Sequence, residues 1–148
     1  MLIFGVKNPS TQAVAADGFV NLGNVYRKFC CKNSCGVGAF GTNSQSINLN
    51  HSGIYHVTAT FVATGDVAGD VTFQLLIDGE AVNGAFSTQT ITTPTTELRT
   101  FVIDYYVLVD NACTLGYNTI ASKTISFQNT GVDATISSVI VNVDKVKA

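Results

Sequence analysis

Charged side chains are scarce in this sequence. Of its 148 residues, 12% are Asp, Glu, Lys or Arg and 46% are hydrophobic, whereas globular proteins usually carry about 25% charged residues. The formal net charge is −2, and no Lys/Arg run extends beyond Arg27-Lys28. Nucleic acids and anionic membranes are captured by basic patches, so neither is expected as a partner. Partner subunits are expected to cover part of the apolar excess.

Long apolar segments are also missing. No run approaches the ~18–20 residues that span a bilayer. The apolar start ends at Lys7 and Pro9, and it lacks the basic region and the small-residue cleavage site of a secretory signal. We therefore expect a soluble protein made in the cytosol, which reaches the outside by lysis or by a dedicated route.

The sequence contains few candidate residues for catalysis. A Ser-His-Asp or Cys-His site would need one of the two histidines, His51 and His56. His51 falls in an expected turn, and His56 falls on the polar face of an expected strand. No G-x-S-x-G, H-E-x-x-H, Walker or G-x-G-x-x-G motif is present. We expect no catalytic residues, no cofactor and no enzyme activity.

Four cysteines leave three interpretations open: Cys30, Cys31, Cys35 and Cys113. Reduced, partly buried thiols fit the lack of a secretory signal. One or two disulfides, such as Cys35 to Cys113, are the second interpretation. A metal site is the third, although C-C-x3-C differs from the C-x2-C pair of structural zinc sites.

Other candidate metal ligands are weaker still. His56 would supply three imidazoles if it lay near a threefold axis, but an exposed strand histidine is the simpler interpretation. Asp66 and Asp70 lack the loop pattern of a calcium site, and we interpret them as solvated loop acids. No metal site is predicted.

Helical periodicity is absent, and alternation with a period of two runs through most of the chain. Gly53 to Ala63 is the clearest strand, and Ser46 to Asn50 is expected to pair beside it. Val71 to Asp78 leads into Asp78-Gly79, a strong type I′ hairpin signal. Eight or more such segments, with turn signals between them, predict an all-β fold: a jelly-roll β-sandwich of about 8–10 antiparallel strands.

The segment Thr96 to Val109 is apolar on both faces. A single small sandwich buries only one of these faces, so the other must meet a second subunit. This argument predicts a subunit interface formed by Val102, Asp104, Tyr106 and Leu108, with Asp104 at its edge or paired across it; the resemblance described below implies that it is a trimer interface.

The first 17 residues are interpreted as an extended arm, followed by a jelly-roll domain over residues 18–148. Leu2, Phe4 and Val6 are the residues expected to dock this arm onto a particle. The same three residues also alternate like an edge strand.

Three segments resemble the jelly roll shared by tumour necrosis factor and the complement globular heads: Asn50 to Val57, which contains Gly-x-Tyr; Leu75 to Val82, a strand with a tight turn and return; and Ile136 to Val143, a closing apolar strand. The resemblance runs from about Arg27 to the C-terminus and is closest to bacterial and phage members, including phage virion proteins and spore-surface heads. It implies a homotrimer whose sandwiches pack around an axis through apolar, aromatic-containing faces.

Together these inferences predict a non-enzymatic structural or decoration protein of a phage virion, assembled in the host cytoplasm. Its expected partners are further copies of itself and a capsid or other virion protein, with a host-surface glycan as a further candidate. A trimeric bacterial surface or spore-coat head is one alternative, and a carbohydrate-binding module is another. Aromatic side chains that would serve partner or sugar contacts, if exposed, are Tyr26, Phe40, Phe86, Tyr105, Tyr106 and Tyr117.

Overall fold

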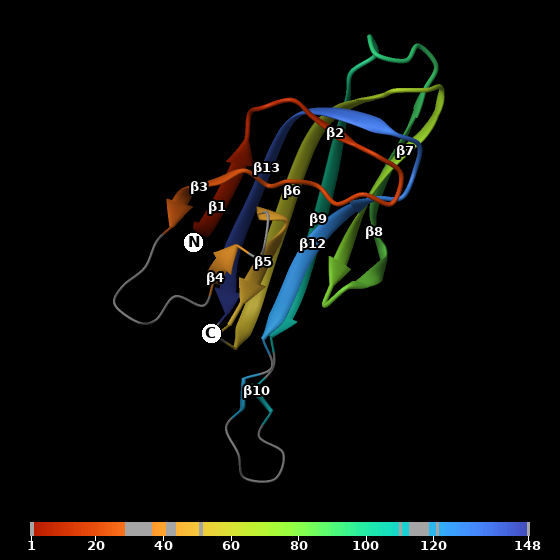
Figure 1. The fold of residues 1–148 in the computed structure, drawn as a ribbon. Coiled ribbons are helices and arrows are strands. Elements are labelled where there is room, and N and C mark those ends of the chain that lie inside the picture. Colours follow the sequence, from red (N-terminus) through yellow and green to blue (C-terminus); the bar gives the residue numbers. More distant parts are fainter. Residues whose placement is uncertain are drawn as a thin grey trace.

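Two antiparallel sheets pack face to face in the computed structural model (Figure 1). The structure describes residues 2–28, 37–40, 44–50, 52–109, 111–112, 119–120 and 122–147. The six-stranded sheet has the order β3-β1-β13-β6-β9, with β2 also paired to β13, and the five-stranded sheet has the order β4-β5-β12-β7-β8. The strands in the described residues are β1 (Leu2–Asn8), β2 (Gln12–Val14), β3 (Asn24–Lys28), β4 (Val37–Phe40), β5 (Ser46–Leu49), β6 (Gly53–Gly65), β7 (Gly69–Ile77), β8 (Glu80–Ile91), β9 (Arg99–Val109), β10 (Asn111–Ala112), β11 (Thr119–Ile120), β12 (Lys123–Asn129) and β13 (Ala134–Lys147). Strands β10 and β11 pair with each other as a separate two-stranded sheet.

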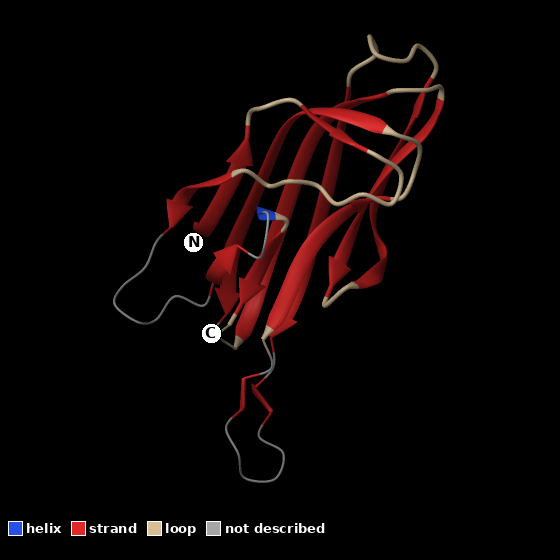
Figure 2. Ribbon diagram, viewed as in Figure 1, coloured by secondary structure: helices blue, strands red, loops and turns tan. Residues whose placement is uncertain are grey.

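The predicted all-β jelly roll is confirmed. Three of the thirteen strands, β2, β10 and β11, have only two or three residues, which leaves ten longer strands. Within the described residues, the sole helical backbone is a turn at Ser44 (Figure 2). None of the described segments is a helix with the length and apolarity needed to cross a membrane.

Four phenylalanines join the two sheets in the core. Phe61 of β6 stacks on Phe73 of β7, with ring centroids 4.8 Å apart, and meets Phe127 of β12 edge-on at 5.4 Å. Phe73 in turn meets Phe101 of β9 edge-on at 4.8 Å. All four rings are fully buried, as the alternation of each strand requires.

The hairpin between β7 and β8 turns at Asp78-Gly79, as predicted. Asp78 has φ 52° and Gly79 has φ 84°, so both central residues have the left-handed backbone of a type I′ turn. Asp78 also accepts a hydrogen bond from the Thr124 backbone N–H at 2.9 Å. The turn is thereby tied to the neighbouring strand β12.

The first 17 residues do not form a separate arm. Strand β1 is hydrogen-bonded between β3 and β13, and Phe4 and Val6 are core side chains with 1% and 0% exposure; the side chain of Leu2 lies outside the described part. The predicted boundary between residues 17 and 18 thus falls inside the sandwich. The physical reason is that β1 covers an edge of β13 that would otherwise expose unpaired backbone groups.

The prediction for Ser46 to Asn50 is also wrong. Strand β5 pairs with β12 and β4 in the five-stranded sheet, whereas β6, which follows it in the chain, belongs to the six-stranded sheet. The short connection between them therefore crosses from one sheet to the other.

Candidate assembly surface

The outer face of β9 is an exposed row of large side chains. Val102, Tyr106 and Leu108 are 52%, 58% and 59% exposed. Phe101, Ile103, Val107 and Val109 of the same strand are buried in the core. The strand is thus apolar on both faces, as the sequence predicted, and a single chain covers only one of them.

The neighbouring strands β6 and β13 continue this outer face. Three rows of directly opposite residues cross the sheet from β9 through β6 to β13: Val102–Thr60–Ile140, Asp104–Thr58–Asn142 and Tyr106–His56–Asp144. Ile140 is 43% exposed. We call the outward side chains of these rows, together with Leu108, the assembly surface. It has apolar side chains toward its ends and polar ones at its centre.

A polar cluster occupies the centre of the assembly surface. The Nε2 atom of His56 contacts Oδ1 of Asp104, and the His56 ring stacks on Tyr106 with centroids 4.6 Å apart and an interplanar angle of 14°. The His56 side chain is 26% exposed, whereas that of Asp104 is 57% exposed. This contact lies diagonally across two strands, so it connects two of the three rows.

Tyr26 of β3 extends the sheet's outer face across β1. Its hydroxyl donates a hydrogen bond to Oδ1 of Asn142, and the Lys7 ammonium lies 5.5 Å from the ring centroid. The ring passes over Gly5, where a Cβ would come within 2.7 Å of two ring carbons. The sequence marked Tyr26 as an aromatic candidate for partner or sugar contacts but did not show which residue it would touch. Gly5, within an apolar alternating strand, is the sequence signal for the close approach of another group.

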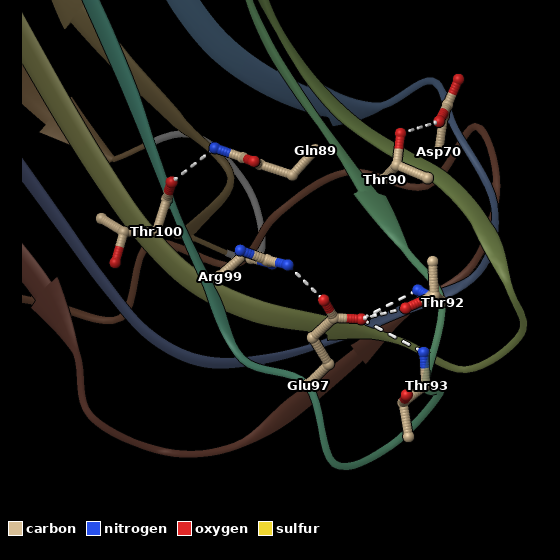
Figure 3. Close-up of polar contacts among 8 residues, drawn as sticks. All are labelled: Asp70, Gln89, Thr90, Thr92, Thr93, Glu97, Arg99 and Thr100. Atoms are coloured by element: carbon tan, nitrogen blue, oxygen red, sulfur yellow. Dashed lines mark hydrogen bonds and ion pairs between the residues drawn. The ribbon is translucent and has the colours of Figure 1, made fainter.

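The connection from β8 to β9 is built around Glu97, just before β9 begins (Figure 3). Its Oε2 atom accepts hydrogen bonds from the backbone N–H groups of Thr92 and Thr93 at 2.8 and 3.1 Å, and its Oε1 atom pairs with Arg99. These backbone hydrogen bonds, with the contribution of Arg99, lower the pKa of Glu97 to about 2. The ionised carboxylate therefore organises the loop that starts the strand of the assembly surface.

Further polar contacts lie near this loop (Figure 3). The Gln89 side chain of β8 donates to the Thr100 carbonyl of β9 at 3.4 Å. Thr90 donates to Asp70 at 2.7 Å. The same end of the sandwich includes Asp66, which accepts a hydrogen bond from Thr135 at 2.6 Å. The expectation of two loop acids holds for Asp66 only, because Asp70 lies in β7, and each carboxylate accepts a hydrogen bond from a threonine hydroxyl.

The predicted site residues divide into two groups. Val102, Asp104, Tyr106 and Leu108 share the exposed face of β9, whereas Phe4 and Val6 lie in the core. His51 and the cysteines Cys30, Cys31, Cys35 and Cys113 lie outside the described residues. Within the described part of the chain, no three His, Cys, Asp or Glu side chains are grouped to hold a metal ion.

Neither a protein-family model nor a characterised protein sequence matches this chain. Solved structures do. Eiger TNF from S. frugiperda superposes with a TM-score of 0.68 at 13% identity, covering 100% of this chain and 96% of that one. Murine APRIL superposes with a TM-score of 0.60 at 9% identity, covering 95% and 98%. At such low identity the likeness shows the fold alone, and that fold is the TNF-type jelly roll to which the sequence motifs pointed.

Proposed function

We propose that this chain is a non-enzymatic structural protein of a phage virion that acts as a homotrimeric binding or display module. The observation that carries the trimer is the row of half-exposed apolar side chains on β9: Val102, Tyr106 and Leu108. With so few charged residues on the whole chain, this row would favour aggregation if it stayed uncovered. Another copy of the same chain is the partner that we propose covers this row.

The position of β9 strengthens this argument. It is one of the two edge strands of the six-stranded sheet, and edge strands with apolar, sparsely charged outer faces tend to pair with other chains or aggregate. A closed ring of three copies covers the same patch on every chain and leaves none for further growth. Burial of apolar surface stabilises such contacts by about 25 cal/mol per Å².

The virion assignment rests on the resemblance of the strand motifs to phage members of this fold class.

The oligomer is tested by light scattering on the purified chain, which should give about three times its mass of 15.6 kDa. A stable monomer at micromolar concentration would refute the trimer. The virion role is tested by mass spectrometry and antibody labelling of purified particles from the producing strain. Labelling of spores or cell envelopes would favour a bacterial surface head, and glycan binding by a monomer would favour a carbohydrate-binding module.

A further inference from the structure

One carboxylate oxygen of the assembly surface has no hydrogen-bond partner within the described structure. The Oδ1 atom of Asp144 on β13 is buried and makes no hydrogen bond within the described structure. Buried carboxylate oxygens nearly always accept a hydrogen bond, because desolvation without one is costly. Since this atom is inaccessible to solvent, its donor must come from the same chain.

A candidate donor on the neighbouring strand is His56. Asp144 lies directly opposite His56 in the antiparallel pair of β13 and β6, where Cβ atoms are about 4.5–5.5 Å apart. The Nε2 atom of His56 already contacts Asp104 on β9. An imidazole thus lies on the middle strand, with one carboxylate on each neighbouring strand.

The other groups around His56 do not compete for Asp144. From β9, His56 is faced by Asp104 and by the phenol of Tyr106, which stacks on it. From β13 it is faced by Asp144, while the ammonium of the next residue, Lys145, lies 5.6 Å from the ring centroid of Tyr55. Two acids and one imidazole therefore make up the charge-bearing part of the cluster.

Protonation changes the number of hydrogen-bond donors on the His56 imidazole. Neutral histidine has one N–H donor, which serves one carboxylate; the imidazolium has two donors, one on each ring nitrogen. A positive ring stacked on Tyr106 is also attracted to the phenol face. The imidazolium also cancels one of the two negative charges that each chain would otherwise place on a surface to be covered.

We propose that His56 is a proton-controlled clamp that bridges Asp104 and Asp144 across three strands and tightens assembly in mildly acidic solution. The proposal rests on the proposed function, because it concerns the surface through which the copies associate. The sign follows from the charges: histidines gain their proton as the pH falls from about 8 to about 5, so assembly is weaker at the upper end of this range.

Sedimentation of the full chain at about pH 8 and about pH 5.5 tests the clamp. For the unmodified chain we expect the concentration of half-assembly to fall about tenfold at the lower pH, because each of the three chains then brings one negative charge fewer to the surface that is covered. His56→Gln should reduce this change to less than about twofold. His51→Gln, which replaces the other histidine, is the matched control and should keep the full change.

The Asp144→Asn variant provides a second test of the clamp. It removes one of the two negative charges, so at about pH 8 this variant should assemble more tightly than the unmodified chain and depend less on pH. Retention of the full pH dependence by His56→Gln would overturn the clamp. So would a trimer whose assembly is the same at both pH values.

Thermal unfolding separates the clamp from the proposed trimer. If every chain is monomeric at both pH values, the trimer fails, and the clamp is judged on the monomer. The melting temperature of the unmodified chain should then exceed that of His56→Gln by more at about pH 5.5 than at about pH 8. An equal difference at both pH values would overturn the clamp as well.

Discussion

The ring of Tyr26 on β3 lies directly over Gly5 on β1, and the Tyr26 hydroxyl reaches beyond it to Asn142 on β13. Three strands are thereby connected by one side chain. The contact is possible because Gly5 has no Cβ: an added one would meet two ring carbons at 2.7 Å.

Gly5→Ala should therefore displace the Tyr26 ring and break its hydrogen bond to Asn142. We expect a loss of about 1–3 kcal/mol in the free energy of unfolding, typical of forcing an extra carbon into a packed site. Denaturant unfolding measures this loss. In a Tyr26→Ala background the same substitution should cost much less, and an equal cost in both backgrounds would show that the ring is not the obstacle.

Tyr106→Asp should weaken self-association, because it introduces a carboxylate into the surface that the copies cover. Light scattering over a concentration series should show dissociation at concentrations where the unmodified chain is trimeric. Phe86→Asp is the matched control, since Phe86 is 53% exposed and Tyr106 is 58% exposed, but Phe86 lies on β8 of the other sheet. Equal weakening by both substitutions would count against the assembly surface.

Phe4→Ala should destabilise the fold by about 3–5 kcal/mol, as expected for truncating a buried phenylalanine. Phe4 is 1% exposed, and its strand fills a place between β3 and β13. Thermal and denaturant unfolding measure the loss. Phe86→Ala, at an exposed position, should cost far less; a fully stable Phe4→Ala chain would restore the interpretation of this segment as a separate arm.

Glu97 should make stability depend on pH in the acid range. Its pKa is lowered to about 2 in the folded chain from 4.5, so the folded state favours the ionised form. The stabilisation is present above about pH 4.5 and is lost as the pH falls toward about 2.

Melting temperatures of the unmodified chain and of Glu97→Gln should therefore converge between about pH 4.5 and pH 2. At neutral pH the Gln variant should melt at a lower temperature, because an amide accepts the Thr92 and Thr93 backbone hydrogen bonds less strongly than a carboxylate does. Glu80→Gln is the control for a general charge effect, and a similar convergence in that variant would argue against the loop as the cause.

Much of the fold follows from local pattern. In β6 the alternation with a period of two matches the burial of every second side chain from Tyr55 to Ala63, and in β9 the pattern identified the second apolar face that remains exposed. Asp78-Gly79 correctly marked a hairpin. These features are predictable because strand geometry sends successive side chains to opposite faces, and because a two-residue turn needs residues that tolerate positive φ.

Local alternation did not predict which distant segments pair with each other. Alternation made β1 a possible strand but did not show that it would pair with β13, more than a hundred residues later. It also placed β5 beside its neighbour in the chain instead of in the opposite sheet. Which strands pair depends on how all strands together satisfy their backbone hydrogen bonds and bury their core faces. The residues of a single strand do not determine this outcome.

The sequence by itself determined the long strands from β6 onward, the inward face of β6 and the second apolar face of β9 with Val102, Tyr106 and Leu108, because each depends on residues a few positions apart. Only the tertiary structure decided that His56 contacts Asp104 while Asp144 lies opposite it, and that Tyr26 rests on Gly5. Each of these relationships joins different strands, so it depends on the order and register of the sheet, which form only when distant parts of the chain pack together.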